Sequence, residues 1–199
     1  MSCKNCKSSK LKKVINIGKQ PISSHFYSNK KTNLRNYSLD LYECQYCKLI
    51  QLKDIAKLKD MYGLNYGYRT SLSPLMIDHM KRKVKKIFTQ NFFKKKANVL
   101  DIGSNDGTFL NFLSKNSNLK LYGIDPSAKK FQNYYNPKIN LIIDYFNKKK
   151  ILEKINKNIK FSLITSFAMF YDIEDPNKFC REINYLLENG NLLFTIDFN

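Results

Sequence analysis

The sequence predicts an α/β fold with a parallel sheet, preceded by a small cysteine-bearing lobe. Strand-like and helix-like segments alternate over residues 96–199, which is typical of parallel sheets with right-handed crossovers. The stretch NVLDIGSNDGTFL, residues 98–110, begins as an apolar strand, turns at a glycine and continues as a helix. Nucleotide sites of open α/β sheets have this layout. Two C-x-x-C pairs lie upstream, before residue 50.

The chain of 199 residues is predicted to divide into three parts. Residues 1–60 hold the cysteine pairs. Residues 61–95 contain a segment rich in tyrosine and glycine, followed by an amphipathic connecting helix. Residues 96–199 form the sheet domain. No internal repeat or low-complexity segment is present.

The elements of the first two parts follow from local patterns. Short β-like pieces are predicted at 12–17 and 37–42, with a turn at 18–21. Ser73 is predicted as a helix N-cap, with Pro74 at the first helical position. The apolar face of that helix is predicted to hold Leu75, Met76, His79, Met80, Val84, Ile87 and Phe88.

The sheet domain is predicted to contain five strands. They are residues 99–102, 119–124, 139–143, 161–165 and 191–196. The last helix is predicted to end at the glycine of residues 188–190. Cys180 lies within the helical pattern, and we expect it to be a small buried hydrophobic residue.

Composition narrows the class of protein. The formal net charge is +19, from 35 Lys and Arg against 16 Asp and Glu. Such charge fits either a nucleic-acid partner or a solvated basic surface, and the basic runs lack regular aromatic interleaving. No apolar run reaches the about 18–20 residues that span a bilayer. The N-terminus lacks the apolar region of a secretory signal, so we expect a cytoplasmic protein without membrane contact.

The cysteine pairs indicate a structural zinc site. Cys3 and Cys6 form one C-x-x-C, and Cys44 and Cys47 form another. Two residues between cysteines let both thiolates of a pair reach one ion, and two pairs complete a tetrahedral Cys₄ shell. Disulfides are the competing interpretation, and a reducing compartment argues against them. A redox motif would need one pair at a helix start.

The loop after the first predicted strand of the sheet domain points to a nucleoside without a pyrophosphate. Asn105 stands where a dinucleotide fingerprint has its middle glycine, and no G-K-[ST] follows. Asp125 ends the next strand, where its carboxylate can accept both ribose hydroxyls. The cationic methionine end of S-adenosylmethionine would tolerate Asp101 and Asp106. The alternative is a generic α/β turn without a ligand.

Several segments together resemble one family. They are VINIGKQPISSHF, CQYCKLIQL, YGYRTSLSPLMIDH, DIGSNDGTFL, GIDPS and ITSFAMFYDIEDP. With them the chain resembles the sugar C-methyltransferases of deoxysugar biosynthesis over essentially its whole length. The resemblance implies a zinc-binding lobe before a Rossmann-like class I methyltransferase domain. It also implies S-adenosylmethionine as the methyl donor and a nucleotide-linked keto-deoxysugar as the acceptor.

The implied chemistry is proton abstraction beside the ketone, followed by attack of the enolate carbon on the methyl group. The resemblance places the donor on Asp101, Gly103, Ser104, Asn105, Gly107, Asp125, Asp144, Tyr145, Phe167 and Ala168, with Phe146 and Met169 beside them. It places the acceptor on Tyr66, Tyr68 and Ser71, and it makes Tyr68 and His79 the catalytic candidates. Simple packing of the tyrosines and of His79 is the alternative.

The family continues beyond its fifth strand into a segment rich in Glu, His and Tyr, which supplies the catalytic base, and then into a second domain. The present sequence ends at Asn199, so we expect an incomplete sheet whose apolar last strand is an exposed edge. A separate C-terminal half or a second copy would cover that edge. Two other classes stay open: an RNA or DNA methyltransferase, and a non-catalytic half that binds the donor and a partner. SFAMFYDIEDP contains neither N-P-P-Y nor Pro-Cys.

Overall fold

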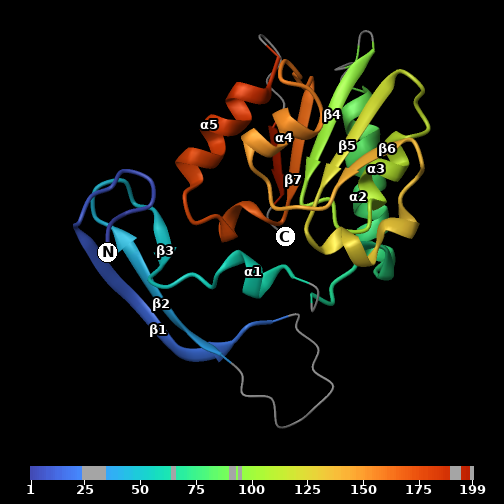
Figure 1. Ribbon diagram of the computed structural model, residues 1–199. Helices are drawn as coiled ribbons and strands as arrows, with labels where there is room; N and C mark the ends of the chain where they lie inside the picture. Colours follow the sequence, from blue (N-terminus) through green and yellow to red (C-terminus); the bar gives the residue numbers. More distant parts are fainter. Residues whose placement is uncertain (24–34, 64–65, 90–92, 94–95, 189–193, 198–199) are drawn as a thin grey trace. The chain divides into compact units, whose positions relative to one another are not determined.

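The computed structural model describes residues 1–23, 35–63, 66–89, 93, 96–188 and 194–197, the last four as backbone. The chain forms two compact units (Figure 1). The first unit is Met1–Gly67 together with Asp172–Cys180, and the second is Tyr68–Tyr171 together with Arg181–Asn199. Among the described residues, no helix is long and apolar enough to cross a membrane.

The first unit is built on a three-stranded antiparallel sheet. Its strands β1 (Leu11–Pro21), β2 (Asn36–Cys44) and β3 (Ile50–Leu52) lie in the order β1-β2-β3, and the short helix α1 (Leu58–Met61) follows. The predicted turn at 18–21 is wrong, because β1 runs through it. Gly18 has a φ of +87° and lies at a register shift, where its N–H donates to Oδ1 of Asn16 (2.6 Å). A bulge of this kind bends a strand without reversing it.

The connecting helix begins as predicted. Helix α2 (Pro74–Thr89) follows the 3₁₀ turn η1 (Thr70–Leu72), and Oγ of Ser73 accepts a hydrogen bond from the N–H of Met76 (3.3 Å). Met80, Val84 and Ile87 are buried on one face. Leu75, in contrast, is 82% exposed. It precedes Met80 by five positions, which turns it about 140° around the helix and away from the apolar face.

The second unit contains a five-stranded parallel sheet, as the alternating pattern predicts. The strands lie in the order β6 (Ile139–Ile142), β5 (Leu119–Ile124), β4 (Ala97–Ile102), β7 (Leu163–Phe167), β8 (Phe194–Asp197). Strand β7 is shifted from the predicted 161–165, because Phe161 forms only an isolated bridge with Leu187. Of the predicted last strand, residues 191–193 lie outside the described part of the chain. The chain moves outward from β4 to β6 and then returns to β7, so a topological switch point lies between β4 and β7.

Helices cover both faces of this sheet. Val99, Leu121 and Leu163 pack in one buried cluster with Met80 of α2 and Leu113 of α3 (Thr108–Leu113). The alternation of side chains along a strand directs Leu100, Tyr122 and Ile164, all fully buried, to the other face. Helix α4 (Lys148–Lys154) lies on that second face, opposite α3 (Figure 1). A sheet buried on both faces needs continuous apolar strands, which the sequence supplies.

Helix α5 (Pro176–Leu186) corrects one sequence prediction. Phe179, Ile183 and Leu186 are buried, at the spacing of one helix face. Cys180 is exposed rather than buried, because it lies one position beyond that face. The predicted helix end at 188–190 falls partly outside the described residues, and the helix itself ends at Leu186.

Candidate functional site

The four cysteines of the C-x-x-C pairs lie together in the first unit. Their Sγ atoms are all within 4.8 Å of one another, with 3.5 Å between Cys3 and Cys47 and 3.5 Å between Cys6 and Cys44. In a tetrahedral zinc site with Zn–S bonds of about 2.3 Å, neighbouring sulfurs are about 3.8 Å apart. The cluster therefore fits the closed Cys₄ site that the spacing predicts, and the ion would contribute structure rather than chemistry.

Each cysteine pair lies in a turn of the same geometry. The residue after the second cysteine is left-handed in both, with a φ of 63° at Lys7 and 64° at Lys48. Its N–H donates to the carbonyl of the first cysteine, at 3.0 Å for Cys3 and 2.9 Å for Cys44. The N–H of each first cysteine donates in turn to the carbonyl five residues ahead, at 2.8 Å in both turns. Two matching turns thus present two thiols each to one point.

The 103–107 loop of the second unit has an unusual backbone. Gly103, Asn105 and Gly107 are left-handed, with φ values of 76°, 50° and 75°. A Cβ at Gly107 would lie 2.7 Å from the ring of Tyr135, so glycine is required there for space as well as for conformation. A Cβ at Gly103 would lie 3.2 Å from Sδ of Met169, a flexible side chain.

Three carboxylates surround this loop. Asp101 at the end of β4, Asp106 in the loop and Asp125 after β5 are 2%, 1% and 7% exposed. Burial raises the pKa of Asp101 to about 7, although a hydrogen bond from Oγ1 of Thr165 (2.6 Å) opposes the rise. Burial also raises the pKa of Asp125. Because buried negative charges repel one another, such a cluster favours a cationic ligand.

Asp125 is in the predicted place, and the protein already bonds both of its oxygens. Oδ2 accepts a hydrogen bond from the N–H of Asn105 (2.9 Å), and Oδ1 accepts from the N–H and the Oγ of Ser127 (2.6 Å each). A carboxylate oxygen can accept two hydrogen bonds, so Oδ2 retains one acceptor site for a ligand hydroxyl. Asp125 therefore also holds the loop in shape.

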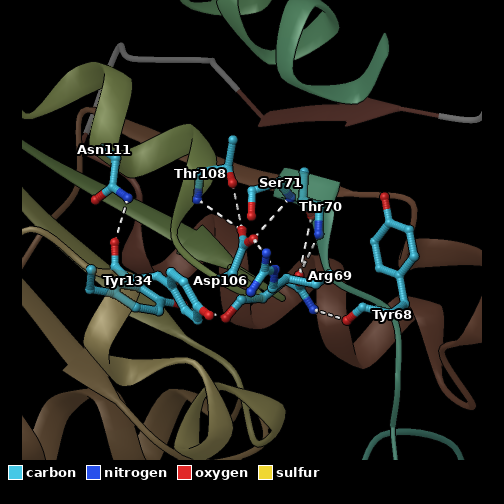
Figure 2. A network of polar contacts seen from close by, with 10 residues as sticks. Tyr68, Arg69, Thr70, Ser71, Asp106, Thr108, Asn111 and Tyr134 are labelled. Carbon is cyan, nitrogen blue, oxygen red and sulfur yellow. Dashed lines mark hydrogen bonds and ion pairs between the residues drawn. The ribbon is translucent and has the colours of Figure 1, made fainter. Parts of the chain in front are cut away.

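The side chains of Asn105 and Asp106 bind the segment 68–71. Oδ1 of Asn105 accepts a hydrogen bond from the N–H of Thr70 (2.9 Å), and its Nδ2 donates to the carbonyl of Tyr68 (3.1 Å). Oδ2 of Asp106 accepts from the N–H of Ser71 (2.9 Å), as Figure 2 shows. Asn105 thus bridges two backbone groups of this segment, which explains a large polar residue where dinucleotide loops have glycine.

Arg69 is a site residue that sequence reasoning missed. Its guanidinium carbon lies 4.4 Å from the centre of the Tyr134 ring, and its Nε lies 3.9 Å from Oδ2 of Asp106. This Nε is buried and has no hydrogen-bond partner among the described residues. Figure 2 shows Arg69 between Asp106 and Tyr134. Its position inside the YGYRTS segment, beside predicted acceptor residues, was the available signal.

Tyr135 is a second residue that was missed. Its hydroxyl lies 2.9 Å from Oγ of Ser104 and donates to the carbonyl of Asn105 (2.8 Å). The predicted donor residue Ser104 is therefore turned toward the protein beneath the loop. Burial raises the pKa of Tyr135 above its ordinary range, so the hydroxyl stays protonated.

Asp144, which follows β6, is bonded by two lysines of α4. Its Oδ1 accepts hydrogen bonds from Nζ of Lys150 (2.5 Å) and from the N–H of Tyr145 (2.8 Å), and Lys154 lies 3.9 Å from Oδ2. The hydrogen bond from Lys150 lowers the pKa of this carboxyl. The predicted aromatic neighbours Tyr145 and Phe146 are half-buried.

The end of β7 and the residues after it carry the predicted fourth-strand motif. Phe167 packs edge-on against Phe109 of α3 (4.8 Å between ring centres), and Ala168 is left-handed with a φ of 50°. Met169 follows, and its side chain faces Gly103.

The acceptor-side candidates are distributed over both units. Tyr68 is 40% exposed, and Ser71 is held to the loop through its backbone. His79 is half-buried on α2. Tyr66 belongs to the first unit, where its ring packs edge-on against Tyr62 (5.1 Å). The acceptor and catalytic roles of these residues remain predictions.

Comparison with known families supports both the methyltransferase domain and the zinc-binding lobe. Residues 76–199 match the family described as "Methyltransferase domain", and residues 3–62 match one described as "Putative zinc binding domain". The first match covers more than half of the chain, so the chain belongs to the methyltransferase domain family. Its fold is the α/β Rossmann-like methyltransferase fold, with an N-terminal Cys₄ lobe.

Individual relatives agree with this assignment. The plantazolicin methyltransferase BpumL, in complex with a pentazolic desmethylPZN analog and SAH, is 25% identical with a TM-score of 0.50, and the match covers 64% of this chain and 49% of that one. BpumL with a triazolic analog and SAH is 24% identical with a TM-score of 0.51, covering 65% and 50%. Ribosomal RNA small subunit methyltransferase A of Phytoplasma australiense is 31% identical over 110 residues, covering 46% and 39%. The chain thus spans about half or less of the length of these relatives.

Proposed function

We propose that the chain binds S-adenosylmethionine at the 103–107 loop and acts as a methyltransferase. The observation that carries the proposal is the cluster of three buried carboxylates, Asp101, Asp106 and Asp125, at the carboxyl ends of β4 and β5. Buried negative charge favours a ligand with a sulfonium and an ammonium group. The likeness to BpumL, whose structure contains SAH, supports the same ligand class.

The proposal gives each of five residues around the loop a defined role in binding the donor. Gly103 and Gly107 let the backbone turn beneath the donor, and the free acceptor site on Oδ2 of Asp125 takes a ribose hydroxyl. Phe167 at the end of β7 and Ala168 directly after it border the reacting end of the donor. When bound, S-adenosylmethionine supplies an electrophilic methyl group. The main contribution of the protein is alignment of that methyl with the acceptor carbon.

For the acceptor we propose a nucleotide-linked keto-deoxysugar that is methylated on carbon. Support comes from the order of a zinc-binding lobe before a methyltransferase domain and from the YGYRTS segment, whose Tyr68 and Ser71 adjoin the loop. The net charge of +19 would attract the diphosphate of such a substrate. Tyr68 and His79 are the candidates for proton transfer from this chain.

Calorimetry tests donor binding. Wild-type protein should bind S-adenosylmethionine and not NAD. Asp125→Ala should weaken binding by about 1–3 kcal/mol, because a ribose hydroxyl loses a charged acceptor. Asp125→Asn keeps the size of the side chain but replaces one of two acceptor oxygens that hold the loop by a donor, so urea unfolding checks that both variants stay folded. Asp78→Asn on the exposed side of α2 is the control. Tight NAD binding without a response to S-adenosylmethionine would overturn the proposal.

The second candidate function is methylation of RNA. The 31% identity with a ribosomal RNA methyltransferase over 110 residues favours it, together with the basic charge. Phosphate neutralisation makes affinity fall steeply with salt, with a log–log slope of about −0.7 per contact on single strands. A diphosphate-linked sugar offers about two charges, so its salt dependence should be shallow.

Titration with short RNA and with a pool of nucleotide-sugars, at low and physiological salt, separates the candidates. RNA binding that survives physiological salt, with methyl transfer to that RNA, would replace the sugar by RNA as the acceptor. Methyl transfer to a nucleotide-sugar would support the sugar. Donor binding with transfer to neither acceptor would favour the non-catalytic alternative.

A further inference from the structure

The two cysteine turns are joined to the sheet of the first unit in different ways. Strand β2 ends at Cys44 and β3 begins at Ile50, so strands hold the Cys44–Cys47 turn on both sides. The Cys3–Cys6 turn is followed by β1, and none of the described residues before it forms a strand. A segment joined to a sheet on one side only keeps more conformational freedom than one joined on both sides. Contacts from elsewhere must therefore fix the first turn against the second.

Gln51, the middle residue of β3, supplies such a contact. The N–H of Lys4 donates a hydrogen bond to Oε1 of Gln51 (2.8 Å), and Nε2 of Gln51 donates to the carbonyl of Ser2 (3.2 Å). These two backbone groups lie on either side of Cys3. The Gln51 residue is 6% exposed, and its two partners are 47 and 49 positions away in the sequence. One buried amide thus holds the backbone on both sides of a predicted metal ligand.

The chemistry of this contact requires an amide. The backbone around Cys3 presents one donor and one acceptor, and a glutamine side chain offers the complementary acceptor and donor side by side. Glutamate would keep the acceptor and lose the donor. Methionine is of similar size and would lose both, which would leave the N–H of Lys4 and the carbonyl of Ser2 without this partner. Losing such a partner costs free energy, so residue 51 can control where the Cys3 backbone lies.

A second amide contacts the same turn from another part of the first unit. Nδ2 of Asn177 donates to the carbonyl of Asn5 (2.7 Å), which lies between Cys3 and Cys6. This hydrogen bond is exposed, whereas the Gln51 side chain is buried. Water can replace an exposed hydrogen bond, so we expect the contact from Asn177 to contribute less.

We propose that Gln51 is a positioning residue for the Cys₄ zinc site. By holding the backbone on both sides of Cys3, it places the thiols of the first turn against those of the second. Each sulfur of the first turn lies 3.5 Å from one sulfur of the second, so the ion is enclosed only when both turns are in place. Residues that orient metal ligands contribute about 10–100-fold to metal affinity.

A general contribution to the stability of the lobe is the rival explanation. In that case Gln51 only helps the three-stranded sheet to fold, and its loss loosens the four thiols alike. The two explanations differ in which cysteines become reactive, because a thiolate bound to zinc is protected from alkylation and a released one reacts. Initial alkylation rates of the zinc-loaded full chain, measured for each cysteine by peptide mass spectrometry, therefore distinguish them.

Gln51→Met is the main test. Competition with a chelator should show that it binds zinc about 10–100-fold more weakly than wild type. At saturating zinc, Cys3 and Cys6 should be alkylated about 10-fold faster than in wild type, while the two cysteines of the second turn stay within about twofold. Asn177→Ala should change zinc affinity by no more than about threefold, since it removes only an exposed contact.

Asp40→Asn is the matched control within the same sheet. Asp40 lies in the middle of β2, is 8% exposed, and forms an ion pair with Lys13 of β1 (2.9 Å). Its substitution weakens the sheet without removing a hydrogen bond to the first turn, so the four cysteines should respond together. Urea unfolding of both variants shows whether their losses of stability are comparable.

Equal acceleration at all four cysteines in Gln51→Met would overturn the positioning role and leave a general stabilising one. Unchanged zinc affinity in that variant would overturn it as well. A wild-type protein that binds no zinc would refute the Cys₄ site itself. If Gln51→Met does not fold, Gln51→Glu keeps the acceptor for Lys4, loses the donor for Ser2 and carries the same test.

Discussion

The cysteine cluster and the 103–107 loop use their motif residues in opposite ways. In the cluster, each of the four side chains that the spacing specifies offers its sulfur to one point. In the loop, Asn105 and Asp106 bind the 68–71 segment, and Asp125 bonds the loop itself. The donor site that we propose at the loop is instead defined by the left-handed backbone and by the charge of the surrounding carboxylates.

The difference teaches which motifs can be interpreted residue by residue. An ion imposes its own distances and geometry on side chains of one type, so matching spacing suffices to identify the ligands. A nucleoside-binding loop requires glycines at the end of a strand. Its other side chains can contact neighbouring parts of the protein instead of the ligand. A metal-binding motif therefore predicts which side chains contact the ligand, whereas a loop motif predicts only where the ligand binds.

The largest expected effect is loss of the metal. Cys44→Ser should release zinc and loosen residues 1–60, because structural zinc contributes about 10–16 kcal/mol in small zinc domains. The parallel sheet of the second unit should survive, since its core is separate. Zinc content per chain and hydrogen exchange by region measure both effects. A folded wild-type protein without metal would contradict the Cys₄ assignment.

The loop itself should be sensitive to a single methyl group. Gly107→Ala should destabilise the second unit by about 2–5 kcal/mol, because the new Cβ meets the Tyr135 ring and the φ of 75° is strained. Gly103→Ala is the matched variant with nearly the same φ, 76°, where a flexible Met169 can move. It should cost about 1–2 kcal/mol. Urea unfolding compares the two, and equal costs would show that close packing at Gly107 is unimportant.

Ionised Asp101 should lower the stability of the fold while it supplies negative charge for a cationic ligand. Its pKa of about 7 exceeds the ordinary 3.8, so the folded state keeps a proton that the unfolded state loses between about pH 4 and 7. Its contribution to stability therefore falls as pH rises through that range. Asp101→Asn removes this penalty, and should stabilise the protein by up to about 4 kcal/mol above pH 7 and by nothing near pH 4.

The same variant should bind S-adenosylmethionine more weakly, because a negative charge beside a cationic ligand is lost. Urea unfolding at pH 4.5 and 8, with calorimetry at pH 8, measures both changes. A gain in stability that is the same at both pH values would show that Asp101 is not the titrating group.

The smallest expected effect concerns the cysteine turns. Lys48→Gly should stabilise the first unit by about 0.5–1 kcal/mol, since a left-handed φ of 64° costs a side chain more than it costs glycine. The exposed ion pair with Glu43 that this substitution removes contributes little to stability.

Gly18→Ala is the reverse test in the same unit, because it replaces a glycine in a left-handed conformation by a residue with a side chain. Its φ is +87° with nothing within 4 Å of the new Cβ, so it should cost about 1 kcal/mol from conformation alone.

Local patterns in the sequence were sufficient for the elements of the second unit. Continuous apolar runs predicted β4 and β5 within two residues of their ends, and Ser73 with Pro74 predicted the start of α2. The Cys₄ cluster followed from spacing. N-capping and the apolar pattern of a strand depend on near neighbours in the chain. The cysteine cluster joins residues 38 and 44 positions apart, but each C-x-x-C pair marks two metal ligands locally, and the ion requires two such pairs.

Tertiary structure alone decided the partners of the loop. The bonds from Thr70 to Asn105 and from Ser71 to Asp106 each join residues 35 positions apart, and no periodicity records such a pairing. The same holds for Arg69 on Tyr134 and for the left-handed bulge at Gly18, where glycine alone cannot tell a turn from a bent strand. The sequence by itself determined most of the helices and strands, the order of the zinc-binding lobe and the sheet domain, and the metal ligands. The path of the chain in space determined which polar side chains bond one another at the proposed donor site, because a hydrogen-bonding group bonds whichever partner folding brings near.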